Sequence, residues 1–196
     1  NRLVKFSPDG TMTVLLDGGY NGKYLNGPND VWADNRGGIY FTDPYYQRNY
    51  WEQGHVQAQE VQGVYYLQPD GKLVRVVDDL KQPNGIVGTP DGKFLYVADI
   101  ASHVTWKYAI REDGTLADKT RFAMAGSDGM TLDSRGNVYL TSGKVLVFDP
   151  KGTKLGEIAL PETPSNLCFG GKNRKTLFIT ARTGVYMVRM RVKGVE

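Results

Sequence analysis

The stretch QPNGIVGTPDGKFLYVAD, from Gln82 to Asp99, contains the pattern that decides the fold. Its second half, FLYVAD, is an apolar run with a central aromatic residue, and it follows an Asp-Gly turn of the kind that joins antiparallel strands. Three similar runs occur elsewhere: GIYFTD from Gly38, NVYLTS from Asn137 and TLFITA from Thr176. The sequence therefore repeats one strand-forming unit four times.

The four central aromatic residues are spaced at regular intervals. They are Tyr40, Tyr96, Tyr139 and Phe178, separated by 56, 43 and 39 residues. A propeller blade of four strands takes about 40–50 residues. Counting the strand-like runs around them, we expect about 17 strands: two, then three groups of four, then three. A β-sandwich does not keep such a period, so the sequence predicts an all-β propeller with blades of four antiparallel strands.

The composition agrees with β structure and excludes several classes of protein. The 24 glycines and 9 prolines among 196 residues disfavour an all-helical fold. The 24 basic and 21 acidic residues are interleaved, so we expect no nucleic-acid partner. No apolar run approaches the ~20 residues of a membrane span, so we expect no membrane segment. Cys168 is the single cysteine, which makes an internal disulfide impossible.

A polar residue precedes each aromatic run at a nearly constant distance. Asn29, Asn84, Asp128 and Asn166 lie 11, 12, 11 and 12 residues before the central aromatic residue. Because the innermost strands of a propeller line its central channel, we expect these four side chains to converge at one channel mouth. Their oxygens suit a hard cation such as Ca²⁺. Each is alternatively an ordinary turn residue, since Asn-Gly and Asp-Gly are common in loops.

A polar, aromatic-rich segment from Tyr45 to Gln62 is too long for a tight hairpin. Loops of this kind commonly cover the channel mouth, so we expect the segment to bind substrate; a solvated surface loop or a contact between subunits is the alternative. Its candidate side chains are Tyr45, Tyr46, Arg48, Trp51 and His55.

The histidines and the cysteine give no support to a nitrogen or sulfur metal site. His55, His103 and Cys168 do not form a ligand-spaced pair. Neither histidine has the Ser/Asp context of a nucleophilic triad. We interpret His103, which opens a strand, as a structural or exposed residue.

Four segments resemble consecutive motifs of the gluconolactonase / senescence-marker-protein (regucalcin) family. They are LNGPNDVWADNRGGIYFTDPYY, LKQPNGIVGTPDGKFLYVAD, GSDGMTLDSRGNVYLTSG and PSNLCFGGKNRKTLFITA, in family order and over nearly the whole chain. The resemblance implies a six-bladed propeller that holds one divalent cation in the channel mouth, commonly Ca²⁺, with Zn²⁺, Mg²⁺ or Mn²⁺ as the other cations considered. It also implies that the substrate is a small lactone of a sugar acid, which the protein hydrolyses.

The resemblance implies roles for individual residues. Asn84 in PNG and Asp128 in SDG match family metal ligands, and Asn29 in PND matches a position that binds metal or substrate. Asp30 matches a further channel-facing position, and we group it with Asn166 among the substrate-binding candidates. Asp128 is the expected catalytic residue, as the base that activates water.

The family's glutamate ligand, part of an EGP-type motif in the first blade, has no match here. Two neutral asparagines with Asp128 supply one negative charge, so we expect a weaker cation site than one that includes the glutamate. The chain, 1–196, is expected to be a single propeller domain of about four to four and a half blades, without the first blade, half of the second and the closing strand. Such an arc is expected to associate with itself or to be completed by the missing N-terminal segment.

Three functions stay open from the sequence. The first is a Ca²⁺-dependent lactone hydrolase of the gluconolactonase type. The second is an organophosphate or fluorophosphate hydrolase that uses the same cation on a P–O or P–F bond. The third is a propeller that binds a metal or a partner without turnover. The first two differ in pocket shape, which the sequence does not reveal.

Overall fold

The computed structural model describes residues 2–48 and 56–195, in which every regular element is a β-strand. The strands form successive antiparallel sheets: β1 (Arg2–Phe6) and β2 (Met12–Asp17); β5 (Val31–Ala33), β6 (Ile39–Asp43), β7 (Gly63–Leu67) and β8 (Leu73–Val77); β9 (Pro83–Gly88), β10 (Phe94–Asp99), β11 (Val104–Ile110) and β12 (Leu116–Ala123); β13 (Met130–Leu132), β14 (Val138–Ser142), β15 (Lys144–Phe148) and β16 (Lys154–Ile158); and β17 (Pro164–Gly170), β18 (Thr176–Ala181) and β19 (Val185–Arg189). A short hairpin of β3 (Gly19–Tyr20) and β4 (Lys23–Tyr24) follows the first sheet.

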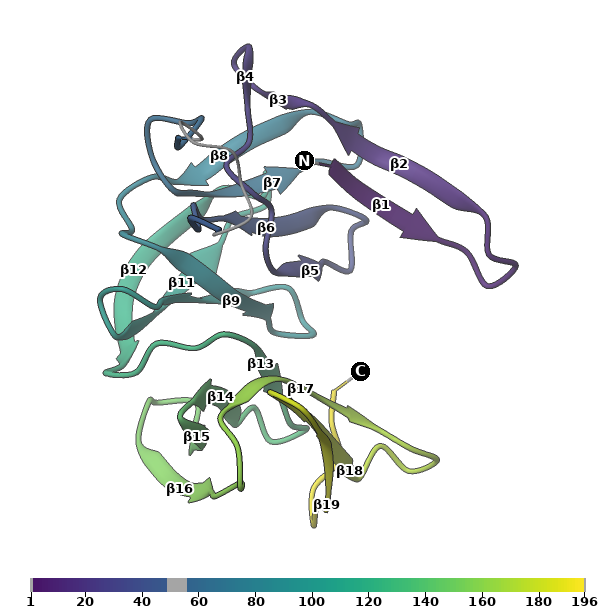
Figure 1. The fold of residues 1–196 in the computed structure, drawn as a ribbon, viewed down its shortest axis with the longest axis vertical. Coiled ribbons are helices and arrows are strands. Elements are labelled where there is room, and N and C mark those ends of the chain that lie inside the picture. Colours follow the sequence, from purple (N-terminus) through teal and green to yellow (C-terminus); the bar gives the residue numbers. More distant parts are fainter. Residues whose placement is uncertain (1, 49–55, 196) are drawn as a thin grey trace.

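The sheets follow one another around an arc (Figure 1). The β1–β2 hairpin lies at one end of the arc and the β17–β18–β19 sheet at the other. Within each four-stranded sheet the spatial order of the strands is their order in the sequence. The predicted propeller architecture is confirmed, together with the grouping of the main strands into two, four, four, four and three.

The core lies between successive sheets because the second strand of each blade is apolar on both faces. In β10, Leu95 and Val97 pack with Tyr40 of the preceding sheet, while Tyr96 and Ala98 pack with the β13–β16 sheet. Successive side chains of a strand point to opposite faces, so one strand can serve two interfaces. This arrangement explains why the apolar runs in the sequence are continuous instead of alternating.

Positive-φ glycines close the turns between the outer strands. Gly71 in the PDG turn has φ 87°, and Gly114 in the EDG turn has φ 82°. Glycine adopts this left-handed conformation without the steric cost that a Cβ would add.

Threonine hydroxyls link neighbouring sheets at one end of the inner strands. Thr42 Oγ1 donates to the carbonyl of Asn84 at 2.8 Å, and Thr141 Oγ1 donates to the carbonyl of Ser165 at 3.2 Å. These bonds fix the backbone at the start of β9 and at the start of β17. The segments that begin the inner strands are therefore held in register with one another.

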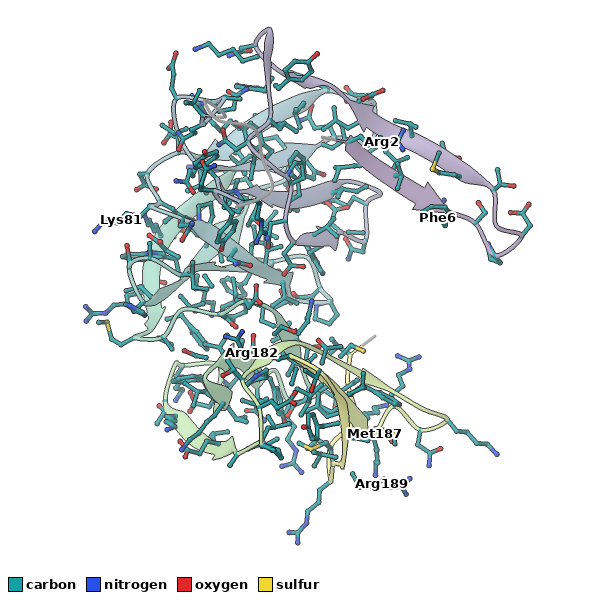
Figure 2. The ribbon with its side chains drawn as sticks, in the orientation of Figure 1. Arg2, Phe6, Lys81, Arg182, Met187 and Arg189 are labelled. Atoms are coloured by element: carbon teal, nitrogen blue, oxygen red, sulfur yellow. The ribbon has the colours of Figure 1, made fainter. Side chains whose placement is uncertain are left out.

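Apolar side chains are exposed at both ends of the arc. Phe6 at the end of β1 is 64% exposed and Met187 on β19 is 69% exposed (Figure 2). The expected self-association stays a prediction. In the described part of the chain, no helix is long and apolar enough to cross a bilayer.

Candidate metal and substrate site

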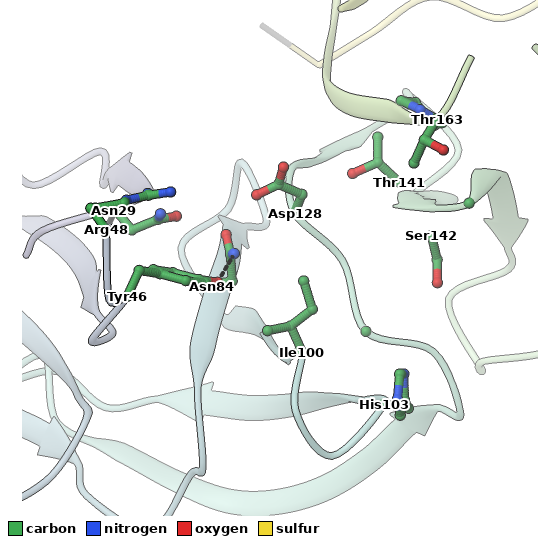
Figure 3. Close-up of a pocket in the computed structure, with 13 residues that line it drawn as sticks. Asn29, Tyr46, Arg48, Asn84, Ile100, His103, Asp128, Thr141, Ser142 and Thr163 are labelled. Carbon is green, nitrogen blue, oxygen red and sulfur yellow. Dashed lines mark hydrogen bonds between the residues drawn. The ribbon is translucent and has the colours of Figure 1, made fainter. Parts of the chain in front are cut away.

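A cavity of about 410 Å³ lies where the inner strands β9 and β13 begin (Figure 3). Its lining comes from strands β9 and β14, from the start of β17 and from loops next to all three four-stranded sheets. A cavity of this size accommodates a small-molecule ligand. The lining residues are Asn29, Tyr46, Arg48, Asn84, Ile100, His103, Gly126, Asp128, Thr141, Ser142, Gly143, Thr163 and Pro164.

Asn84 is the second residue of β9, and only 2% of its surface is exposed. Its Nδ2 donates a hydrogen bond to Tyr46 Oη at 2.6 Å. Its Oδ1 is buried and has no hydrogen-bond partner among the described residues. A buried carbonyl oxygen without a donor is unfavourable unless another electropositive group satisfies it. Asn84 therefore presents an oxygen suited to a cation.

Asp128 is the one carboxylate among the described residues that line the cavity. Its backbone N–H donates to the carbonyl of Thr141 at 3.3 Å. The preceding residue, Ser127, is fully buried and donates from Oγ to the carbonyl of Gly129 at 2.6 Å. These bonds fix the backbone on both sides of Asp128, whose own residue surface is exposed.

The surroundings of Asp128 change the pKa of its carboxyl group. Partial burial raises the pKa of its carboxyl above 3.8, and the neighbouring Asn84 side chain works against that shift. Figure 3 shows the Asn84 amide between Tyr46 and Asp128. A carboxylate with a raised pKa accepts a proton more readily than an ordinary aspartate.

Hydrogen bonds identify equivalent positions in different sheets. The N–H of Asn29 donates to the carbonyl of Thr42 at 2.9 Å, as the N–H of Asp128 does to Thr141. Asn29 and Asp128 therefore occupy the same position in two blades, as the sequence spacing predicted. Asn29 lines the cavity and is exposed.

Asn166 does not take the fourth equivalent position, so the predicted ring of four is wrong at this member. Its N–H donates to Thr180 Oγ1 at 3.1 Å, which is the type of bond that Asp30 makes with the threonine of its own blade. Asn166 pairs with Thr180 in the β17–β18 register, so the residue before it, Ser165, takes the position equivalent to Asn29 and Asp128. Asn166 lies outside the cavity lining, and its Oδ1 accepts the N–H of the next residue at 2.7 Å. Its predicted contact with substrate stays a prediction.

Asp30 also lies outside the lining of the cavity. Its Oδ2 accepts the N–H of Ile86 at 2.9 Å and its Oδ1 accepts the N–H of Val31 at 3.0 Å. Burial raises the pKa of Asp30 to about 6, and these two hydrogen bonds oppose the shift. The structure therefore shows Asp30 joining β5 to β9, next to the cavity.

Only some residues of the segment predicted to bind substrate line the cavity. Tyr46 and Arg48 line the cavity, and the Arg48 guanidinium lies 5.2 Å from the centre of the Tyr46 ring. Tyr45 lies outside the lining, and its N–H donates to Gln62 Oε1 at 2.9 Å. Two further candidates lie outside the described residues: Trp51 and His55.

Sequence reasoning missed four polar lining residues: His103, Thr141, Ser142 and Thr163. His103 is exposed and has φ 54°, a left-handed conformation in which histidine is one of the more frequent non-glycine residues. Their place in the fold could have indicated them, because these residues lie at strand ends or on loops near the start of β9, β13 and β17.

The donor set fits a hard cation. Asn84 and Asn29 offer amide oxygens and Asp128 offers a carboxylate, which are ligand types that Ca²⁺ accepts. Residues 2–48 and 56–195 contain no group of three or more His, Cys, Asp or Glu that could hold a metal ion. No described glutamate lines the cavity, so the described ligand set carries one negative charge.

The comparisons with known proteins all find similarity to gluconolactonases or their family. The family described as SMP-30/Gluconolactonase/LRE-like region matches residues 2–183. The gluconolactonase of Zymomonas mobilis is 34% identical over 208 aligned residues, which cover 98% of this chain and 58% of that protein. This chain therefore spans less than two thirds of the length of that curated relative.

Two solved structures share the fold at similar identity. A gluconolactonase from Xanthomonas campestris is 36% identical with a TM-score of 0.85, over 95% of this chain and 64% of that one. A structural-genomics target assigned to the gluconolactonases is 32% identical with a TM-score of 0.89, over 100% of this chain and 69% of that one.

Proposed function

The chain belongs to the SMP-30/gluconolactonase/LRE-like family, and we propose that it hydrolyses lactones of sugar acids with the help of a divalent cation, Ca²⁺ in the first place. The observation that carries the proposal is the buried Oδ1 of Asn84, which has no hydrogen-bond partner in the described part of the chain and belongs to a residue that lines the same cavity as Asp128. The gluconolactonases of Zymomonas mobilis and Xanthomonas campestris support the choice of substrate class.

The residues that would hold the cation are Asn84, Asp128 and Asn29. When bound, the cation would polarise the lactone carbonyl and stabilise the negative charge that develops on its oxygen. Since the described ligands include one carboxylate, we expect modest affinity, with millimolar calcium as the practical working range for a first titration.

Asp128 is the proposed base for the chemical step. Its carboxylate accepts a proton from a water molecule whose oxygen attacks the carbonyl carbon of the lactone. The bond between that carbon and the ring oxygen then breaks, and the ring oxygen takes up the proton. The product is the open hydroxy acid, so no oxidant, reductant or other co-reactant is required.

The rest of the cavity suits a polyhydroxylated substrate. Ser142 and Thr163 bring hydroxyl groups to the lining, and His103 brings an imidazole. These groups can donate to and accept from sugar hydroxyls. Arg48 brings a permanent positive charge, which favours the carboxylate of the product and of acidic sugar lactones.

The experiment that tests this proposal measures acid release from aldonolactones and from a fluorophosphate ester. Each substrate is followed by pH-stat titration with calcium, with chelator and without protein, because lactones also open spontaneously. We expect lactone opening that chelator removes and added calcium restores. Turnover of the fluorophosphate alone would support the organophosphate hydrolase, and calcium binding without any turnover would support the non-catalytic binding protein.

A further inference from the structure

The orientation of the Asn84 amide decides whether this residue can serve a cation. A carboxamide has an acceptor end, Oδ1, and a donor end, Nδ2, which exchange places when the group rotates by half a turn. In the structure Nδ2 donates to Tyr46 Oη at 2.6 Å, and Oδ1 is left buried without a partner among the described residues. The groups that bind Nδ2 therefore control which end is available: Tyr46 Oη, together with the neighbouring Asp128 carboxylate.

Tyr46 is held in place by its own neighbours. The Arg48 guanidinium lies 5.2 Å from the centre of the Tyr46 ring, within the range of a cation–π contact. The carbonyl of Tyr45 accepts a hydrogen bond at 3.1 Å from Nε2 of Gln82, which lies just before β9. The segment that carries the phenol is thus tied to the strand that carries Asn84.

We propose that Tyr46 is a positioning residue for the cation site, because its phenol oxygen holds the Asn84 amide with Oδ1 available to the cavity. This inference rests on the cation dependence of the proposed function. In the reverse orientation the amide would present its N–H groups in place of the oxygen, and N–H groups repel a cation. Tyr46 acts through Asn84 and takes no part in the reacting bonds.

The variant Tyr46→Phe tests the role directly, since it keeps the aromatic ring beside Arg48 and removes the acceptor oxygen. Nδ2 of Asn84 then loses its hydrogen bond to Tyr46 Oη and keeps only the neighbouring Asp128 carboxylate, so the amide is held less firmly in this orientation. We expect the affinity for calcium to fall about tenfold, the size expected when a buried donor loses its acceptor. The measurement is isothermal titration with calcium chloride in the absence of lactone, so it does not depend on turnover.

A matched control removes a phenol hydroxyl elsewhere. Tyr24 on β4 is 71% exposed and does not line the cavity, so Tyr24→Phe is expected to bind calcium with wild-type affinity. Thermal unfolding of each variant checks that the protein is folded under the conditions of the titration.

Testing Tyr46→Phe in a second protein, the Asn84→Asp variant, distinguishes an effect on the orientation of the amide from an effect on side-chain packing. In Asn84→Asp both side-chain atoms that can face the cation are oxygens, so the orientation of the group no longer matters. Adding Tyr46→Phe in that background is expected to change calcium affinity by less than about twofold, and the double-mutant cycle gives the coupling between the two residues.

Two results would overturn the inference. One is wild-type calcium affinity in folded Tyr46→Phe; the other is an equal loss in both backgrounds, which would mean that the phenol acts on packing alone. If the wild-type protein binds no calcium, this inference and the cation dependence of the proposed function fail together. If the wild type binds calcium and Tyr46→Phe binds it equally well, only this inference fails.

Discussion

The two ends of strand β13 carry aspartates with opposite properties. Asp133, directly after the strand, is fully buried, and its Oδ1 accepts the N–H of Arg135 at 2.8 Å and of Asn137 at 3.0 Å. Its Oδ2 accepts Asn137 Nδ2 at 2.8 Å and Tyr139 Oη at 3.0 Å. Asp128, just before the strand, is exposed to the cavity and accepts none of the described backbone N–H groups.

The difference in hydrogen bonding distinguishes an aspartate that stabilises the fold, Asp133, from one that can bind a ligand, Asp128. A carboxylate whose oxygens are all occupied by the protein contributes to folding and has nothing left for a ligand. The strand β5 shows the same contrast, because Asp34 after it accepts from Arg36 N, Gly38 N and Tyr66 Oη, whereas Asn29 before it lines the cavity. Residue type alone does not distinguish the two ends; hydrogen-bond occupancy does.

Removing the acid at the cavity end is expected to have the largest effect. Asp128→Asn keeps the size of the side chain but loses the proposed proton acceptor, so lactone turnover should fall by at least about a thousandfold. Steady-state kinetics on gluconolactone measures the change, with spontaneous opening subtracted. Because Asp128 is exposed, the free energy of unfolding in urea should stay close to that of the wild type. Substantial lactonase activity in the variant would count against Asp128 as the base.

Removing the acid at the opposite end is expected to act on stability. Asp133→Ala leaves two backbone N–H groups, an amide and the Tyr139 hydroxyl without their acceptor, so the free energy of unfolding should fall by about 2–3 kcal/mol. Urea unfolding measures the loss. Asp149→Ala is the matched control, because Asp149 makes the same turn bonds to Lys151 and Thr153 at the exposed surface, and a smaller loss is expected. An equal loss in both variants would show that burial is not the cause.

Two further buried aspartates, Asp43 and Asp99, are expected to change the stability of the protein with pH in different ways. Asp43 accepts the N–H groups of Asn26 and Gly27, and Asp99 accepts those of Lys81 and Gln82, in equivalent places of two blades. Burial raises the pKa of Asp43 to about 6 against those hydrogen bonds. Burial also acts to raise the pKa of Asp99, but hydrogen bonds outweigh it and the pKa falls below 3.8.

The sign of the pH dependence therefore differs between the two residues. A raised folded-state pKa means that Asp43 favours folding when protonated, so its contribution is greatest below pH 3.8 and is lost as pH rises through about 6. Relative to Asp43→Asn, the wild type should gain about 1–2 kcal/mol of unfolding free energy between pH 7 and pH 4.5. Relative to Asp99→Asn it should gain nothing over that range and lose stability below about pH 4. Urea unfolding at several pH values measures both, and parallel profiles would contradict the assignment.

The fold was predictable because each blade repeats the same apolar run. Tyr40, Tyr96 and Tyr139 mark equivalent buried positions, and their spacing was enough to group the main strands correctly. Asn84 and Asp128 were placed near one another by the same argument. Those predictions depend on a regular register, which the sequence displays directly.

The remaining features depend on irregular geometry. The pairing of Asn166 with Thr180, which puts Ser165 in the equivalent position, leaves no mark on the spacing, because the offset of Asn166 from its aromatic residue equals that of Asn84. The hydrogen bond between Tyr46 and Asn84 joins residues 38 positions apart, and the left-handed backbone of His103 has no distinct sequence signal. Contacts between loops of different blades follow from the way the sheets pack against one another, which a one-dimensional pattern does not specify.

The most direct test of the account is calcium titration calorimetry on the wild type, Asp128→Asn and Asp133→Asn, without lactone. The account predicts that Asp128→Asn weakens calcium binding by at least about tenfold, because the described cavity loses its negative charge. It predicts that Asp133→Asn, while folded, binds calcium as the wild type does. Equal affinity in Asp128→Asn and the wild type, or a loss confined to Asp133→Asn, would contradict the assignment of the cation site to the cavity end of the inner strands.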